Sequence, residues 1–331
     1  MAEVEFRPFH PSQTDELLKF LVKWTPNHPE LGNREVFDWQ KANGYVAMHE
    51  GKIVGHLAQI PHEFRYGKRS GQEGTELMGP GISFILDMSN DEIRKKAGRG
   101  LLDHFEANQP PYFAAIGIVP EIEEPYKRRG YAVHRDYTNL YGRFMNPSRA
   151  LKYWSRSALY APAIHAANIL YRPRMKKGIL PVEKITEFKP EWDELWEKLK
   201  YEQYELYGVR TADFLNYKLS QPGKEYHIYL HNEGGYIIYR LATHPLKDLR
   251  LVKICDMAGT DDIKLDLISL AMKFAYEAKA DGIVAMAADI DKAIYKKAGL
   301  YISEPKPLVI SPHLKKQLHI TFFDSDLDHL W

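Results

Sequence analysis

Residues 125–131 read Pro125-Tyr126-Lys127-Arg128-Arg129-Gly130-Tyr131, and residues 294–300 repeat the pattern as Ile294-Tyr295-Lys296-Lys297-Ala298-Gly299-Leu300. A second echo, Leu86-Asp87-Met88 against Cys255-Asp256-Met257, has the same offset of 169 positions (256 − 87 and 295 − 126). The offset holds between the two echoes without an internal gap, which is the signature of a duplicated unit. The sequence therefore predicts two copies of one fold.

Composition sets the class of protein. The 331 residues are 44% hydrophobic and 27% charged, the profile of an ordered globular protein. A net charge of +1 supplies no field for gathering nucleic acid, so we expect no nucleic-acid partner. The single cysteine, Cys255, makes no internal disulfide, and we see neither a signal-peptide pattern nor a membrane-length apolar run. We expect a cytoplasmic protein without a metal site.

The pattern of each copy predicts a mixed sheet with helices on its faces. The expected elements of copy one are strands at 44–49, 53–58, 81–88 and 112–119 and helices at 91–108 and 123–128. The expected elements of copy two, which begins near Ile185, are a helix at 192–207 and strands at 226–230 and 236–241. The predicted division of the chain is an N-terminal domain at 1–142, a basic aromatic helical linker at 143–184, a C-terminal domain at 185–310 and a tail at 311–331.

One segment of copy one carries the chemistry. Residues 95–100 read Lys95-Lys96-Ala97-Gly98-Arg99-Gly100, and the two glycines are predicted at the start of a helix. Unpaired first-turn N–H groups and the helix dipole favour an anion there, so a pyrophosphate would settle at this point. The alternative is a solvated basic first turn without a ligand.

These residues resemble the GCN5-related N-acetyltransferases (GNAT), whose acetyl-CoA loop has the form Gln/Arg-x-x-Gly-x-Gly/Ala. Residues 95–100 match it with Lys at the first place. Residues 126–131 are similar to the family's closing Tyr-x-x-x-Gly-Phe/Tyr, and 46–57 to its hairpin. The resemblance covers about residues 4 to 142, and more faintly 185 to 310. It implies an α/β fold of two GNAT-like mixed-sheet domains with helices on both faces, a tandem type that the family contains.

The resemblance implies acyl-CoA, by default acetyl-CoA, as the co-substrate of copy one. The cofactor-binding residues that it implies are Asp87, Met88, Lys95, Lys96, Ala97, Gly98, Arg99 and Gly100. Position 119 is Val119, where many members have an asparagine that contacts the cofactor, so this contact is in doubt.

Copy two departs from the loop. The glycines Gly98 and Gly100 map onto Leu267 and Ser269, and Lys95 maps onto Lys264. We therefore predict that copy two has lost the phosphate cradle and shapes the acceptor pocket instead.

The resemblance also implies direct attack of an acceptor amine on the thioester in a ternary complex. A carboxylate, Asp87 or Glu76, takes the amine proton, and Tyr126 occupies the place of the family's tyrosine acid. Backbone N–H groups near Asp87 and Met88 polarise the thioester carbonyl. The structural alternatives are that Tyr126 is a core aromatic, as its repeat partner Tyr295 suggests, and that Asp87 caps the loop.

Residues 143–177 contain eight cations and no acidic residue, interleaved with aromatics. One interpretation is a connector of helical turns packed on both copies. A second is a segment resting on anionic membrane lipid, and a third is a recognition surface for an anionic acceptor. Further along, residues 209–218, which include Arg210, resemble a segment of tandem members that are often associated with surface-polysaccharide or lipid-linked acylation. The tail from His319, with Asp324, folds back over the cleft between the copies or frays.

The function predicted is that of a CoA-dependent N-acyltransferase that moves an acyl group, by default acetyl, to a primary amine of a small molecule such as an amino sugar. Two alternatives remain open. One is a long-chain acyl-CoA N-acyltransferase acting on a lipid or sphingoid amine at a membrane surface. The other is a non-catalytic acyl-CoA-binding protein. The sequence leaves the oligomeric state undetermined.

Overall fold

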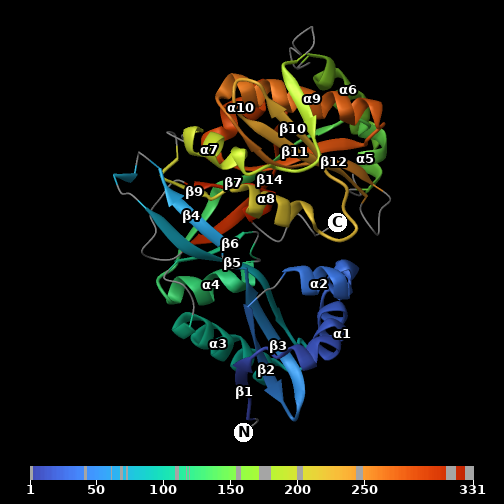
Figure 1. Ribbon diagram of the computed structural model, residues 1–331. Helices are drawn as coiled ribbons and strands as arrows, with labels where there is room; N and C mark the ends of the chain where they lie inside the picture. The colour runs from blue at the N-terminus through green and yellow to red at the C-terminus, as the bar shows by residue number, and fades with distance from the viewer. Residues whose placement is uncertain are drawn as a thin grey trace.

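The computed structural model shows two halves of mixed α/β structure, with the N-terminal half below and the C-terminal half above in Figure 1. The structure describes residues 3–40, 43–60, 62–67, 70–71, 74–108, 112–116, 118, 120–153, 158–170, 180–199, 204–243, 249–310 and 318–324.

The first copy supplies eleven of the principal elements. They are β1 (Glu5–Pro8), α1 (Thr14–Trp24), α2 (Arg34–Gln40), β2 (Asn43–His49), β3 (Lys52–Gln59), β4 (His62–Tyr66), β5 (Thr75–Leu86), α3 (Asp91–Asn108), β6 (Tyr112–Ile116), α4 (Pro120–Arg128) and β7 (Ala132–Phe144). Two helices follow, α5 (Pro147–Tyr153) and α6 (Ala161–Leu170), with the 3-10 turn η4 (Ala158–Tyr160) between them.

The elements of the second copy are β8 (Val182–Ile185), α7 (Glu191–Lys198), β9 (Leu206–Gly208), α8 (Ala212–Leu219), β10 (His227–His231), β11 (Tyr236–Thr243), β12 (Arg250–Ala258), α9 (Asp261–Glu277), β13 (Gly282–Ala288), α10 (Lys292–Lys297), β14 (Tyr301–Ile310), β15 (Leu318–His319) and the 3-10 turn η6 (Phe322–Asp324). Up to β14 the second copy repeats the order of the first with two differences: strand β9 lies between its first two helices, and it has no counterpart of β4.

The predicted repeat is confirmed by these bounds. A shift of 169 carries α3 from 91–108 to 260–277, against 261–277 for α9, and carries the start of β7 onto the start of β14 (132 + 169 = 301). Two details were wrong. The third strand begins at Thr75 rather than Gly81, and the helix expected at 192–207 ends at Lys198, with Leu206–Gly208 forming strand β9.

Helices cover both faces of the copy-one sheet, as predicted for the fold class (Figure 1). Successive residues of β2 point to opposite faces, so Val46 and Met48 pack in one core cluster with α1, whereas Ala47 packs in another with α3. Copy two is built in the same way, because Leu267 of α9 and Leu215 of α8 belong to different clusters that share the strands between them. This layering keeps the sheet out of water on both sides.

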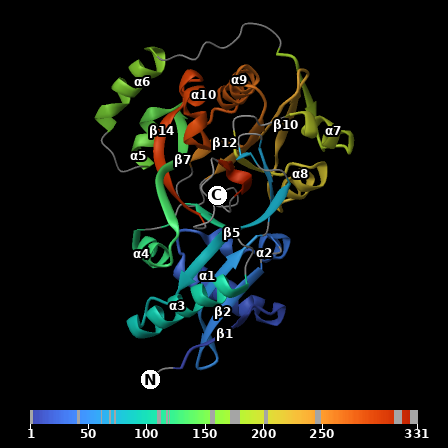
Figure 2. The same cartoon turned by 90° about the vertical axis from the view of Figure 1, so that its left-hand side faces the viewer.

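The two copies exchange their last strands. The sheet order is β1-β2-β3-β5-β6-β14-β7-β13-β12-β11-β10-β8. Strand β14 of copy two pairs with β6 of copy one, and β7 of copy one pairs with β13 of copy two. The exchanged strands also pair with each other, antiparallel, from Tyr301 opposite Gly142 to Ile310 opposite Ala132 (Figure 2). Since β7 and β14 are repeat equivalents, their pairing places an approximate two-fold axis between the copies.

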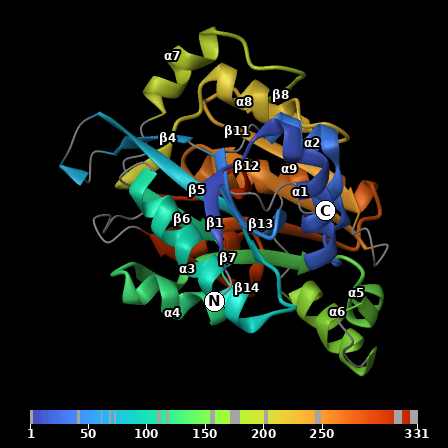
Figure 3. The ribbon, with the colours of Figure 1, turned by 90° about the horizontal axis from the view of Figure 1, so that it is seen from below.

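A second contact joins equivalent helices, α2 and α8, which lie close together when the molecule is viewed from below (Figure 3). Trp39 and Tyr217 occupy matching positions, 178 residues apart like the caps Asn33 and Thr211 (217 − 39 and 211 − 33). Their rings stack with centroids 5.0 Å apart. The Trp39 indole donates to the carbonyl of Tyr217 at 3.1 Å, and the Tyr217 hydroxyl donates to the carbonyl of Trp39 at 2.9 Å. We call this reciprocal contact the clasp.

Within the described residues, none of the helices combines the length and the apolar composition that crossing a membrane requires.

The clasp should show as an energetic coupling between the two aromatic side chains. We expect a double-mutant cycle of Trp39→Leu and Tyr217→Leu, measured by denaturant unfolding, to give a coupling of about 0.5–1.5 kcal/mol, because stacked rings stabilise one another beyond their buried area. Tyr276→Leu, at an exposed position on α9, is the control and should add to Trp39→Leu without coupling. Additive effects for the clasp pair would contradict the contact.

Candidate functional site

Two parallel strands separate in copy one. Strand β5 pairs with β6 only from Met78 opposite Tyr112 to Gly81 opposite Ala115. Strand β6 ends at Ile116, whereas β5 continues to Leu86, where β3 is its only partner strand among the residues that the structure describes. Ligands of α/β sheets bind at the carboxyl ends of parallel strands, where neighbouring strands part. The end of β5 and the loop that follows it are therefore the candidate site.

The equivalent strands of copy two also separate, but the chain covers them. Strand β12 pairs with β13 up to Ile254 opposite Ala285, and both strands then continue without pairing to each other. The turn η6 contacts both strands at this point, and β15 contacts β13. Every side chain from His319 to Asp324 is buried, and the Lys253 ammonium lies 4.5 Å from the ring centroid of Phe322. The tail therefore folds back, as one of the two sequence alternatives expected.

The helix of copy one forms with the predicted bounds, 91–108, but Gly98 and Gly100 do not stand at its start as expected. Helix α3 begins at Asp91, with Asn90 as its cap: the amides of Glu92 and Ile93 donate to Asn90 Oδ1 at 3.0 and 3.2 Å. The glycines were expected in the first turn because the asparagine cap went unrecognised. The first turn is thus already satisfied, and it carries the carboxylates of Asp91 and Glu92.

Gly98 and Gly100 lie inside α3 and pack it against the sheet. A Cβ at Gly98 would lie 3.0 Å from Leu86, and one at Gly100 would overlap the ring of Phe6. In this structure the glycines permit close contact between helix and strands. Their amides belong to the helix interior, so they form no phosphate cradle at a helix start.

The cations of this segment lie on the outside of α3. Lys95 is 72% exposed and pairs with Asp91 at 2.6 Å, and Lys96 pairs with Glu92 at 2.9 Å. Arg94 also pairs with Asp91, and Arg99 is exposed. Ala97 is buried between the helix and the sheet. The segment presents a row of cations on one surface, and exposed pairs of this kind contribute at most about 1 kcal/mol each.

Asp87 shapes the loop after β5. Its Oδ1 accepts hydrogen bonds from the amide of Ser89 at 2.8 Å and from the Ser89 hydroxyl at 2.5 Å. The Asp87 amide donates to the carbonyl of Val54 at 2.9 Å, so it belongs to the sheet and does not point at a ligand. Met88, next in the chain, is exposed. In the part of the chain that the structure describes, Oδ2 of Asp87 accepts no hydrogen bond.

Tyr126 lies in the core of copy one. It is 2% exposed, belongs to the cluster of α3 and the sheet, and meets the ring of Tyr131 edge to face at 5.3 Å. Burial raises the pKa of its phenol far above the usual value, so Tyr126 is protonated near pH 7. Glu76 lies on β5 opposite Phe64, but its side chain is outside the described residues, as is Val119.

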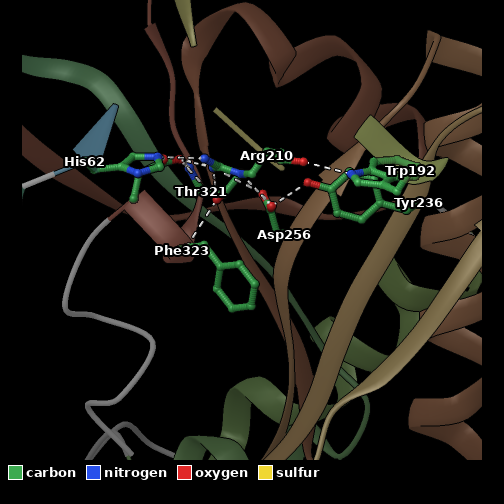
Figure 4. A network of polar contacts seen from close by, with 8 residues as sticks. His62, Trp192, Arg210, Tyr236, Asp256, Thr321 and Phe323 are labelled. Atoms are coloured by element: carbon green, nitrogen blue, oxygen red, sulfur yellow. Dashed lines mark hydrogen bonds and ion pairs between the residues drawn. The ribbon is translucent and has the colours of Figure 1, made fainter. Parts of the chain in front are cut away.

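A buried ion cluster joins both copies and the tail (Figure 4). At its centre Arg210, fully buried, donates from Nε to Asp256 at 2.7 Å and from Nη2 to Asp324 at 2.6 Å. The Tyr236 hydroxyl donates to Asp256 at 2.6 Å. Breaking one partner of such a buried pair would cost about 3–5 kcal/mol, because the remaining charge has no water. The cluster therefore fixes the tail over the strands of copy two.

His62 brings β4 of copy one into the same cluster. Its Nε2 lies 3.1 Å from Arg210 Nη1, and since a guanidinium only donates, Nε2 accepts and the ring proton sits on Nδ1. Burial, with the Arg210 charge, lowers the pKa of His62 to about 4 despite the nearby Asp324 carboxylate. Burial alone would raise the pKa of Asp324, but Arg210 reverses the effect and holds it well below its usual range. His62 is neutral and Asp324 is charged near pH 7.

A small residue makes room for this cluster. A Cβ at Gly208, on β9, would lie 2.6 Å from both Asp324 Oδ1 and His62 Nε2. Strand β9 pairs with β4 on one side and with β15 on the other, so Gly208 lets three strands from both copies approach the ions.

A second buried polar group, centred on Lys264, lies on α9 where copy two was predicted to have lost the phosphate-binding loop. Lys264, the repeat partner of Lys95, is 2% exposed and donates to Asp291 at 3.0 Å. It also donates to the Tyr204 hydroxyl at 3.0 Å. The lysine of copy two thus points inward and supports the fold, whereas the lysine of copy one points outward.

The sequence analysis missed most of these residues. It singled out Arg210 and Asp324 separately but did not connect them, and it passed over His62. The available signal was that Asp256 repeats Asp87: a carboxylate in the middle of a buried strand run demands a cation, and Arg210 is in the same copy.

The low pKa of His62 predicts a pH dependence of stability. Between about pH 6.5 and pH 4 the unfolded chain binds a proton at this residue that the folded chain does not bind, so the free energy of unfolding falls as the pH falls. His62→Gln retains an acceptor for Arg210 and should reduce this slope by up to ~1.4 kcal/mol per pH unit.

Denaturant titrations at several pH values measure the slope. His165→Gln, at an exposed position on α6, is the matched control and should leave the slope unchanged. A slope in His62→Gln equal to that of the wild type would show that folding does not lower the pKa of His62.

Comparisons with known proteins identify the fold. No family model matches the sequence, and neither does any curated protein. Among solved structures, yeast (Saccharomyces cerevisiae) N-myristoyltransferase with bound myristoyl-CoA and inhibitors has a TM-score of 0.63 at 11% identity, over 94% of this chain and 81% of the other. A GCN5-related N-acetyltransferase from Anabaena variabilis has a TM-score of 0.62 at 14% identity, over 93% and 72%. One from Kribbella flavida has a TM-score of 0.54 at 11% identity, over 93% and 71%.

These likenesses cover both copies of the repeat, and they confirm the fold that the sequence resemblance implied. The chain has the GNAT fold in a tandem arrangement.

Proposed function

We propose that this protein is an acyl-CoA-dependent N-acyltransferase with one donor site, in copy one. The observation that carries the proposal is the parting of β5 from β6 in a fold that N-acetyltransferases and N-myristoyltransferase share. The same parting in copy two is covered by the tail, which the Arg210 cluster holds in place. Copy two then contributes to the acceptor side, as a degenerate partner.

The residues of copy one fit the charge of CoA, although not the predicted backbone cradle. The cations Arg94, Lys95, Lys96 and Arg99 lie along the start of α3, and their pairs with Asp91 and Glu92 are weak and exposed. Phosphate groups are stronger partners for these side chains than the two carboxylates. In this proposal side chains hold the phosphates, and Ala97, Gly98 and Gly100 keep the helix packed on the sheet.

The proposed chemistry needs a proton acceptor and a proton donor. The bound thioester supplies the acyl group. Asp87, whose Oδ1 is held by Ser89, offers Oδ2 to take the proton of the attacking amine, with Glu76 on the same strand as the other candidate. Tyr126, which stands where the family has its tyrosine acid, supplies the proton that the departing sulfur requires. The acceptor is a primary amine of a small molecule, such as an amino sugar.

Binding of the donor tests the position of the site. Acetyl-CoA should raise the melting temperature of the wild type, and Lys95→Glu should weaken binding about tenfold, the effect of losing one charge-assisted contact. Lys273→Glu reverses an exposed lysine on α9 that also pairs with an acid four residues away, so it is a matched control and should bind like the wild type. Equal weakening in both variants, or in neither, would contradict a site on α3.

Turnover tests the reaction. We expect thiol release from acetyl-CoA or palmitoyl-CoA with at least one member of a panel of amino sugars, amino acids, polyamines and sphingoid bases. Tyr126→Phe should lower kcat by about 10²-fold with little change in KM, as loss of a general acid does. Tyr295 of copy two is the repeat equivalent of Tyr126, and its buried ring stacks on Tyr141 of β7. The control variant Tyr295→Phe should therefore keep the wild-type kcat.

The outcomes separate the alternatives. Release only with palmitoyl-CoA and a lipid amine would favour the long-chain transferase. Donor binding without release from any member of the panel would overturn the catalytic function and leave a binding protein.

A further inference from the structure

The most exposed large apolar side chains of the described residues all belong to two consecutive elements, η4 and α6. Leu159 is 87% exposed, Ile169 is 73% and Tyr160 is 61%, and each exceeds every other large apolar side chain that the structure describes. All three lie on η4 and α6, which stand at the periphery of the molecule in every view (Figures 1, 2 and 3). Single exposed apolar residues are common on protein surfaces, but a cluster of the most exposed ones marks an interaction site.

The outer face of α6 has no charged group. None of the residues Ala161–Leu170 is acidic or basic, apart from the titratable His165. Ala161 is buried and Asn168 is half-buried, so they define the inner side. Pro162, Ala166 and Ile169 are exposed, and their spacing of four and three residues places them on one outer face. A helix in this position on a water-exposed protein would ordinarily present polar side chains there.

The helix is fixed to the body of the protein by its inner side. Arg143, buried at the end of β7, donates to the carbonyl of Asn168 at 2.6 Å and to that of Gly299 at 3.1 Å. The Asn168 side chain donates to the carbonyl of Phe144 at 2.7 Å. These bonds connect α6 to the end of β7 and to the turn before β14, the two exchanged strands. The orientation of its apolar face is therefore fixed.

The chain around this face is strongly basic. Residues 143–177 contain eight Lys and Arg and no Asp or Glu. Four of these cations, Arg172, Arg174, Lys176 and Lys177, follow the last residue of α6 within seven positions of the sequence (177 − 170). The rest of the protein has a net negative charge (+1 − 8 = −7), whereas this segment contains cations without any acidic residue.

We propose that η4 and α6 form the surface with which this protein docks on an anionic lipid membrane. The apolar face, with Leu159 and Ile169 as its largest groups, enters the boundary between headgroups and acyl chains, and Tyr160 has the amphipathic ring that this depth favours. The adjacent cations attract anionic headgroups, each by about 1 kcal/mol near the surface. A protein partner would require acidic side chains placed opposite this segment and a surface of complementary shape. An anionic membrane supplies negative charge and an apolar interior without a specific shape. The inference does not depend on the proposed acyl transfer.

Vesicle flotation tests the docking surface on the full chain. The wild type should float with vesicles of phosphatidylcholine and phosphatidylglycerol and remain unbound with phosphatidylcholine alone. Leu159→Glu with Ile169→Glu should reduce the bound fraction at least tenfold, because two charges would enter the apolar boundary. Tyr276→Glu, at another exposed aromatic position on α9, is the matched control and should bind like the wild type.

Two further measurements keep the outcome decisive. Hydrogen exchange of the wild type should slow in residues 158–170 when anionic vesicles are added, which requires no variant. Acetyl-CoA should stabilise the double variant as it stabilises the wild type, so loss of docking and loss of the donor site are distinguishable. The proposal would be overturned if the wild type did not float, or if the double variant floated equally well. It would also be overturned if, without vesicles, the wild type were a dimer and the double variant a monomer.

Discussion

The pairing of β7 with β14 is the contact on which the remaining structure depends. These strands stand between β6 and β13, so the middle of the sheet alternates strands of the two copies. A strand withdrawn from this arrangement would leave two unpaired edges, each a row of free backbone donors and acceptors. The clasp between Trp39 and Tyr217 adds a second contact between equivalent parts. Two sequence repeats therefore form one cooperative body, with Arg143 linking the end of β7 to the turn before β14.

The same scaffold supports different roles in its two copies because matching residues meet different surroundings. Lys95 lies at the surface of α3 beside Asp91, whereas Lys264 is buried with Asp291 and Tyr204. Asp87 arranges a loop through Ser89, whereas its counterpart Asp256 neutralises a buried arginine. In copy two these charged groups belong to the core, and the tail covers the ends of β12 and β13, where the two strands separate. Copy one kept its polar groups near solvent, where a ligand can reach them.

The sequence was a sufficient guide to the repeat and to most elements, because these follow from local signals. The turn residue Gly51 predicts the hairpin of β2 and β3, and the spacing of apolar residues predicts the helix at 91–108. The two glycines were expected at the start of the helix, but they lie inside α3, because the helix is capped by Asn90. The exchange of strands and the Arg210 cluster were not predictable, since His62 and Asp324 are brought together by tertiary packing, and no local pattern encodes which strands become neighbours.

The exchange also imposes an order on biosynthesis. Strand β6 pairs with β5 but lacks its second neighbour until residues 301–310 of β14 have left the ribosome. The first unit therefore stays incomplete while more than half of the polypeptide, residues 117–300, is made. During that interval the nascent chain presents an open strand edge to chaperones and to other nascent chains. A stalled or shortened translation product would therefore be more hazardous to the cell than the number of its missing residues suggests.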